Sequence, residues 1–181
     1  MALLPFTFAG AAAPFGVEDV MRLLAERPSA SVRFVETRES RMLKKPLTLS
    51  GRLVYQKPDR LEKHVESPFA ESTVIERNAV IVTRPGDIGQ PLAVPAGTPA
   101  RALIEGLRAT MAGDRSTLER HFSMTASGTH DRWTLVLTPR DDRLAAAVER
   151  VEFRGERGNV LRIEVRERSG DRSLTTIDPP S

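Results

Sequence analysis

The sequence predicts an α+β protein, an unclosed antiparallel β-barrel of about ten or eleven strands with a helical lid. Short segments that alternate apolar and polar residues make up most of the chain, and Gly, Pro, Asn or Asp residues separate them. Longer helical patterns interrupt this series only at the N-terminus and at residues 98–122. A sheet with one apolar and one polar face must curve around an apolar interior, and these helices are the segments that can cover its open side.

The first helical pattern ends at Pro28 and carries four apolar residues at helical spacing: Val17, Val20, Met21 and Leu24. Residues 1–16 are uncharged and resemble the end of a secretory signal. We therefore expect a residual signal-like or disordered tail at 1–16 and a single domain at 17–178. No later segment reaches the roughly 20 apolar residues of a membrane span, so we expect a soluble protein.

Period-two patterns predict the strands of the first half, with turns at Pro58–Asp59 and Asn78. These strands are centred on Val32–Phe34, Leu47–Gln56, Arg60–Glu66, Ser72–Arg77 and Ala79–Thr83. The segment 84–99 is rich in Pro and Gly and is expected to be a loop.

The second helical pattern starts with Thr98 as N-cap and Pro99 in the first turn, and Gly113 ends it. Its apolar residues are Leu103, Ile104, Leu107 and Met111. Ser116–Glu119 has the spacing of a capping box and predicts a short helix that ends near Phe122.

Strand patterns resume after this helix, with one short helix expected at 141–147, capped by the Asp141–Asp142 pair. A turn is expected at Gly155–Gly158. The strands are centred on Phe122–Ala126, Trp133–Leu137, Val151–Phe153, Leu161–Val165 and Leu174–Ile177.

Composition and motifs argue against several function classes. The 27 Lys and Arg residues are interleaved with 24 Asp and Glu residues, without the basic stripe of a nucleic-acid binder. The chain has no Cys, which excludes disulfides, thiolate metal sites and Cys nucleophiles. His64, His121 and His130 lack the spacing of a zinc pair, and no G-x-S-x-G motif is present. We therefore expect no metal, no cofactor and no enzymatic activity.

Several segments, in this order, resemble the LolA family of periplasmic carriers of outer-membrane lipoproteins. They are Phe34–Glu36, Ser50–Pro58, Glu71–Ile75, Trp133–Pro139 and the hairpin of residues 151–165. The resemblance implies an unclosed antiparallel barrel with a helical lid. Lys57 replaces the Arg that precedes Pro in the family, Arg77–Asn78 replaces its D-G turn, and the Pro- and Gly-rich loop is longer.

The candidate ligand-binding residues are apolar positions of the predicted strands and of the second helix, together with one lysine. They are Val32, Phe34, Leu49, Leu53, Tyr55, Lys57, Leu61, Val74, Leu103, Leu107, Met111, Trp133, Leu135, Leu137 and Phe153. Aliphatic residues dominate the set, which suits an acyl chain that gains about 0.8 kcal/mol per buried methylene. The same residues would form an ordinary core in any fold. Lys57 is expected at the rim, where it could hold the lid through lid carbonyls or could be a solvated edge residue.

These features favour a monomeric periplasmic carrier that binds the acyl chains of a lipoprotein or another lipid and transfers it between membranes. The resemblance implies an inner-membrane exporter and an outer-membrane acceptor as partners. The alternative is a periplasmic regulatory module of the same fold that senses lipid or lipoprotein. Binding by burial alone is unspecific, so both a lipoprotein and another acylated molecule remain open as cargo.

Overall fold

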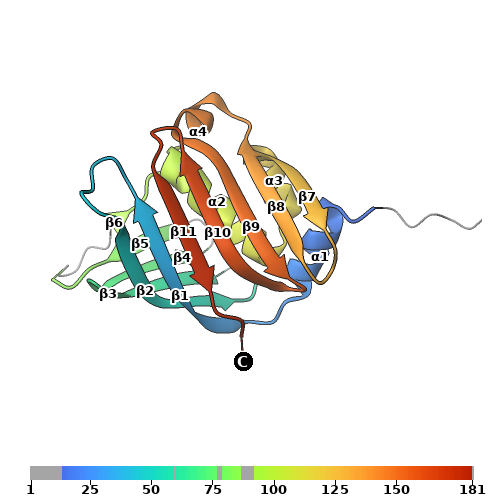
Figure 1. Cartoon of the computed structure of the whole chain (residues 1–181), viewed down its shortest axis with the longest axis horizontal. Coiled ribbons are helices and arrows are strands. Elements are labelled where there is room, and N and C mark those ends of the chain that lie inside the picture. Colours follow the sequence, from blue (N-terminus) through green and yellow to red (C-terminus); the bar gives the residue numbers. More distant parts are fainter. Residues whose placement is uncertain (1–13, 59, 77–78, 87–91, 181) are drawn as a thin grey trace, which may run out of the picture.

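A computed structural model describes residues 14–58, 60–76, 79–86 and 92–180 (Figure 1). The helices are α1 (Val17–Glu26), α2 (Pro99–Ala112), α3 (Arg115–His121) and α4 (Asp142–Ala147). The strands are β1 (Ala30–Glu39), β2 (Leu47–Gln56), β3 (Arg60–Ser67), β4 (Glu71–Glu76), β5 (Ala79–Thr83), β6 (Leu92–Ala93), β7 (Phe122–Gly128), β8 (Trp133–Pro139), β9 (Val148–Glu156), β10 (Asn159–Glu167) and β11 (Arg172–Ile177). The expectations for residues 1–13, Asp59 and Arg77–Asn78 lie outside the described residues.

All the strands form one antiparallel sheet of eleven strands, in the order β6-β5-β4-β3-β2-β1-β11-β10-β9-β8-β7. The first and last strands of this order, β6 and β7, do not pair with each other, so the barrel is unclosed as the sequence predicts. Figure 1 shows the curved sheet with α2 and α3 on its concave side. The two-residue strand β6 lies in the expected loop 84–99 and is too short to show a period. In the described part of the chain, no helix has the length and apolar character needed to cross a bilayer.

The ends of α2 follow the predicted capping pattern. Thr98 Oγ1 accepts a hydrogen bond from the Arg101 N–H (3.3 Å), which satisfies one of the free donors of the first turn. At the other end Gly113 has φ 67°, the left-handed conformation that favours glycine. A Cβ on Gly113 would lie 2.4 Å from the carbonyl oxygen of Met21, so this glycine also lets α2 pack closely against α1.

The capping box expected for the short helix α3 is wrong. Asp114 is the N-cap, and its Oδ1 accepts a hydrogen bond from the Thr117 N–H (3.0 Å). Glu119 does not reach back to Ser116 but pairs with Arg115, whose Nε lies 2.7 Å from the Glu119 carboxylate. The helix therefore begins two residues earlier than the Ser116 cap of the sequence pattern predicts, directly after the turn at Gly113. The expected cap of α4 is confirmed, because Asp141 Oδ1 accepts from the Leu144 N–H (2.8 Å).

A bulge in β10 changes which of its residues face the core. Val160 pairs with Gly155 and Arg162 with Arg154, so β10 advances two residues while β9 advances one. Val160 is therefore buried in the core, whereas Leu161 is not among the residues packed against it. The expectation that Leu161 shares a face with Ile163 and Val165 fails because alternation assumes an unbroken register.

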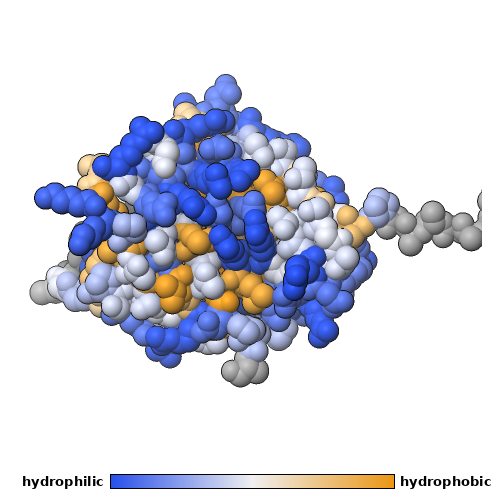
Figure 2. Space-filling model, in the orientation of Figure 1, coloured by the Kyte–Doolittle hydropathy of each residue, from blue (hydrophilic) through white to orange (hydrophobic). Residues whose placement is uncertain are grey.

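The convex face of the sheet is covered with ion pairs. Glu164 on β10 is buried among arginines, with Arg166 Nε at 2.6 Å and Arg172 Nε at 3.1 Å. Burial raises the pKa of the Glu164 carboxyl, but these arginines outweigh burial and hold that pKa below its ordinary value. Figure 2 shows hydrophilic side chains over much of this face, with hydrophobic ones between them in its lower half.

Candidate binding site

A cavity of about 400 Å³ lies between the concave face of the sheet and α2. This volume falls within the roughly 300–1,000 Å³ typical of small-molecule sites. The apolar lining comes from both layers. The sheet contributes Leu53, Leu61, Ile75, Ile163 and Val165, and α2 contributes Leu103, Ile104, Leu107 and Met111.

The cavity exists because α2 packs closely against only one half of the sheet. Gly106 faces the ring of Phe122 at the start of β7, and a Cβ at this position would lie 2.6 Å from the ring. Ala109 on the same side of the helix is fully buried. Small residues thus bring α2 close to β7, while Leu103 and Leu107 on another face remain half-buried and line the cavity.

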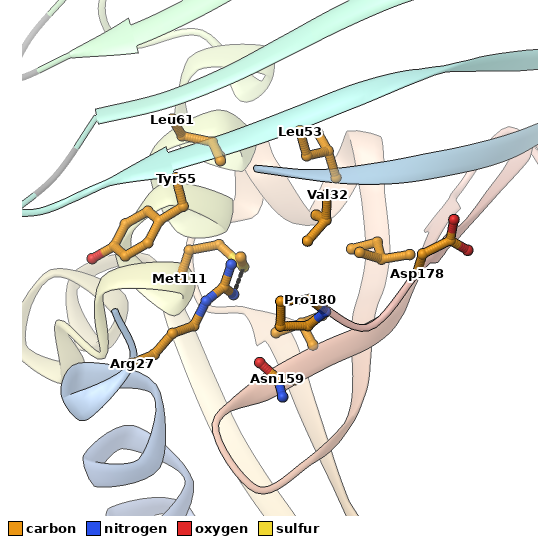
Figure 3. A pocket seen from close by; sticks show the side chains of 11 residues that line it. Arg27, Val32, Leu53, Tyr55, Leu61, Met111, Asn159, Asp178 and Pro180 are labelled. Atoms are coloured by element: carbon orange, nitrogen blue, oxygen red, sulfur yellow. Dashed lines mark hydrogen bonds between the residues drawn. The ribbon is translucent and has the colours of Figure 1, made fainter. Parts of the chain in front are cut away.

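At one end the cavity narrows into a small pocket of about 10 Å³, which shares Leu53, Leu61 and Met111 with it (Figure 3). Arg27, which directly follows α1, extends toward Met111 of α2, with its Nη1 3.9 Å from the Met111 sulfur. Its guanidinium also lies 5.3 Å from the centre of the Tyr55 ring, within the range of a cation–π contact. Burial lowers the pKa of Arg27. Arg27 therefore links α1, α2 and β2 at this inner end.

A charged cluster lies in the cavity wall, formed by Glu36 and Arg38 of β1 and Lys63 of β3. Glu36 is only 3% exposed, accepts a hydrogen bond from Arg38 Nε (2.5 Å) and is paired with the Lys63 ammonium. Lys63 reaches Glu36 across β2, where Gly51 pairs with Phe34 and has no side chain on the concave face. Its ammonium lies 5.1 Å from the centre of the Phe34 ring.

Burial and charge act in opposite directions on these groups. Burial raises the pKa of the Glu36 carboxyl, but the charge of Lys63 and the hydrogen bonds from Lys63 and Arg38 hold that pKa below its ordinary value. Burial lowers the pKa of Lys63, against the attraction of Glu36. Because the pKa of Glu36 is lowered, we treat Glu36 as ionised at neutral pH.

Of the residues expected to bind ligand, five line the cavity: Leu53, Leu61, Leu103, Leu107 and Met111. Val32 and Tyr55 line the small pocket next to it. Six others are buried core residues outside both linings: Phe34, Leu49, Trp133, Leu135, Leu137 and Phe153. The four from β8 and β9 lie in the half of the sheet that the helices cover closely. The Trp133 indole is fixed there, because its Nε1 donates to the Arg157 carbonyl oxygen (2.8 Å).

The expectation for Val74 is wrong, because its side chain lies on the convex face. Val74 pairs with Glu62 and Ile81, whereas its neighbours Thr73 and Ile75 share the face of the cavity and line it. Apolar residues at two consecutive positions of β4 leave the alternation ambiguous, and the pairing with β3 decides the face.

Lys57 contacts α1 and not α2. Its Nζ donates to the Ala25 carbonyl oxygen (3.0 Å) in the last turn of α1, and its backbone N–H donates to Ser29 Oγ (3.0 Å). It therefore reaches a helix carbonyl, as expected for a residue that holds the cover, but in the N-terminal helix.

Sequence reasoning missed the residues that give the cavity its polar wall, and it missed Arg27. Glu36 lies in a segment that resembles the LolA family, and Lys63 lies in a predicted strand. Nothing in either segment indicates that its charged side chain faces the cavity. Their pairing across β2 has no local signal. In the described residues, no group of three or more His, Asp and Glu side chains is placed to hold a metal ion.

One protein family matches most of this chain. The family model described as outer membrane lipoprotein carrier protein LolA-like matches residues 9–178. No match was found among curated protein sequences. Among solved structures, a LolA superfamily protein from Nitrosomonas europaea is similar at 11% identity and a TM-score of 0.49, over 91% of this chain and 92% of that chain.

Two further structures are similar at comparable levels. A chain of the Pseudomonas aeruginosa MucA/MucB complex is 14% identical with a TM-score of 0.45, over 91% of this chain and 58% of that chain. LprF from Mycobacterium bovis is 11% identical with a TM-score of 0.40, over 91% of this chain and 90% of that chain. With TM-scores below 0.5, these likenesses support no conclusion about function.

Proposed function

Because the chain belongs to the family of LolA-like outer membrane lipoprotein carrier proteins, we propose that it is a periplasmic carrier that takes an acyl chain into the cavity beneath α2. The cargo is a lipoprotein or another lipid, received from an inner-membrane exporter and delivered to an outer-membrane acceptor. The role is binding and transfer, without catalysis.

The observation that carries this proposal is the cavity itself, with one wall from the sheet and the other from α2. Leu53, Leu61 and Ile75 face Leu103 and Leu107 across it. Each methylene that leaves water for such a site contributes about 0.8 kcal/mol, so a fatty acyl chain is held without any polar contact.

Entry and release require that α2 moves while the sheet stays folded. Leu103, Ile104 and Leu107 of this wall are half-buried, so their displacement exposes less apolar surface than displacement of fully buried residues would. Lys57, through its hydrogen bond to Ala25, fixes the end of α1 and in this proposal steadies the cover while cargo is bound. Arg27, which touches both α1 and Met111 of α2, couples the two helices.

A titration with a fluorescent fatty acid tests the proposal. The delipidated protein should bind one dansyl-labelled fatty acid saturably, and palmitate should displace it. The affinity of unlabelled fatty acids should rise about fourfold per added methylene until the cavity is filled, which corresponds to about 0.8 kcal/mol for each. Absence of saturable binding, or an affinity independent of chain length, would contradict an acyl cavity.

A further inference from the structure

The charged cluster of Glu36, Arg38 and Lys63 makes the cavity wall amphipathic. Charged groups in an apolar cavity cost free energy unless they are paired, and Glu36 is paired with both cations. Two cations share one carboxylate, so the cluster carries one positive charge in excess.

The cations of the cluster retain hydrogen-bond donors that a ligand can use. In the part of the chain that the structure describes, the Arg38 guanidinium contacts a carboxylate only through Nε, although a guanidinium has five N–H donors. The Arg38 side chain is 44% exposed and lines the cavity. The Lys63 ammonium pairs with Glu36, and the Lys63 side chain as a whole is 25% exposed.

The cluster lies between the small pocket, whose lining is mainly apolar but includes Arg27 and Asp178, and the mouth of the cavity. Along β1, the residues on the concave face are Val32 in the small inner pocket, then Phe34, Glu36 and Arg38, and Ser40 follows at the rim. An amphiphile therefore fits with its chain toward Leu61 and its head group near Arg38.

We infer that the cavity selects amphiphiles with an anionic head group, a carboxylate or a phosphate, which Arg38 and Lys63 bind while the acyl chain lies under α2. This inference rests on the proposed function. The carboxylates of Glu39, Glu167 and Asp171 line the rim and repel an anion there. Arg172 also lines the cavity, but its Nε is paired with Glu164, so the head group is placed at Arg38.

Competition against the dansyl-labelled fatty acid separates the contribution of the head group to binding from that of the acyl chain. Palmitate, hexadecanol and a lysophosphatidic acid of the same chain length are compared on wild type, Arg38→Gln and the control Arg33→Gln. Arg33 lies on the same strand but on the convex face, where it pairs with Glu66. A second variant, Glu36→Gln with Lys63→Met, removes the buried pair and leaves the partly exposed Arg38 as the remaining charge of the cluster.

Arg38→Gln should weaken palmitate about tenfold and leave hexadecanol unchanged, as expected for one lost charged hydrogen bond. The control should change neither ligand, and the lysophosphatidic acid shows whether phosphate is preferred to carboxylate. Equal binding of palmitate and hexadecanol by wild type, Arg38→Gln and the double variant would overturn the head-group site. The proposal that the protein carries an acyl chain would stand. Binding of neither ligand by wild type would overturn both.

An independent observation concerns the loop between β1 and β2, residues 40–46, which projects beyond the sheet in Figure 1. Met42 at its tip is 93% exposed and Leu43 is 42% exposed. The loop is held in shape from the β10–β11 turn, since Asp171 accepts hydrogen bonds from Ser40 Oγ (2.7 Å) and the Arg41 N–H (3.1 Å).

Cations flank the exposed apolar tip, and the segment 40–46 contains no acidic residue. Arg41, Lys44 and Lys45 form no ion pair with the described residues, in contrast to the paired arginines of the convex face. An apolar tip with adjacent unpaired cations matches the surface of an anionic bilayer, where each cation contributes attraction and the apolar residues insert. Ser40 also lines the mouth of the cavity.

The geometry points to this loop as the contact with an anionic membrane surface, which brings the cavity mouth to the bilayer. Co-sedimentation with vesicles of equal parts phosphatidylcholine and phosphatidylglycerol, and with phosphatidylcholine alone, tests it. Wild type should bind the anionic vesicles, and Met42→Ser with Leu43→Ser or Lys44→Ser with Lys45→Ser should each weaken this about tenfold. Arg132→Ser, in the β7–β8 turn at the opposite end of the sheet, should bind as wild type does. Unchanged binding of both loop variants, or no binding by wild type, would overturn the assignment.

Discussion

Replacing Leu107 with Glu tests whether this residue belongs to a movable lid or to the folded core. Leu107 is half-buried and lines the cavity. Full burial of a Leu side chain contributes about 1.5–3 kcal/mol, so its loss here should cost about 1 kcal/mol of folding stability. For a chain of this length, that corresponds to a fall in Tm of about 2–4 °C. Binding should suffer more, because an acyl chain must displace water from the new carboxylate, and we expect about 2 kcal/mol or a thirtyfold rise in Kd.

Ala109→Glu is the matched control, two residues along the same helix. Ala109 is fully buried, so a carboxylate there should cost several kcal/mol and threaten folding. Thermal melts and fatty-acid titrations on both variants distinguish the two positions. If Leu107→Glu unfolds as readily as Ala109→Glu, or keeps wild-type affinity, the reasoning that α2 is a movable wall is refuted.

Three further predictions concern single contacts. Glu36→Gln should cost about 2 kcal/mol at pH 7 and flatten the acid end of the stability profile, measured by urea unfolding. The pKa of Glu36 is lowered in the folded state, so its contribution to the free energy of unfolding is present above about pH 4.3 and is lost as the pH falls through the folded-state pKa. Identical acid profiles of wild type and Glu36→Gln would contradict this. Gly106→Ala should lower stability by about 1–3 kcal/mol, because its Cβ would meet the Phe122 ring. An unchanged Tm would contradict the close packing of Gly106 on this ring. Lys57→Met should raise the dissociation rate of the fluorescent fatty acid severalfold. The Tm should change by only a few degrees, because the exposed hydrogen bond to Ala25 contributes about 1 kcal/mol or less. An unchanged dissociation rate would show that Lys57 does not control release.

The alternation of apolar and polar residues predicted the buried face of a strand correctly where the apolar residues occupy every second position. In β2, Leu49 and Tyr55 are buried on the concave side, as the pattern indicates. It failed where the pattern is locally ambiguous, as at Val74 and Ile75, or where the register shifts, as at Leu161. In each case the pairing of neighbouring strands decides the face, and that pairing is not a local property.

The candidate site was predictable only in part for a similar reason. The sequence pattern identifies the apolar stripe of α2 but not the half of the sheet that this stripe faces. That choice depends on the close packing of Gly106 against Phe122, which leaves Trp133 in the core and Leu53 in the cavity. The pairing of Glu36 with Lys63 likewise joins residues of two strands that lie on either side of β2 and are far apart in the sequence.

Photo-crosslinking tests most directly the central claim that an acyl chain occupies the space between the sheet and α2. A fatty acid with a diazirine near the end of its chain is bound, irradiated and mapped by peptide mass spectrometry, with and without excess palmitate. We predict labelling of the peptides that contain Leu53, Ile75 and Leu107, and its loss in the presence of palmitate. Labelling mainly on the convex face, or labelling that palmitate does not reduce, would contradict the account.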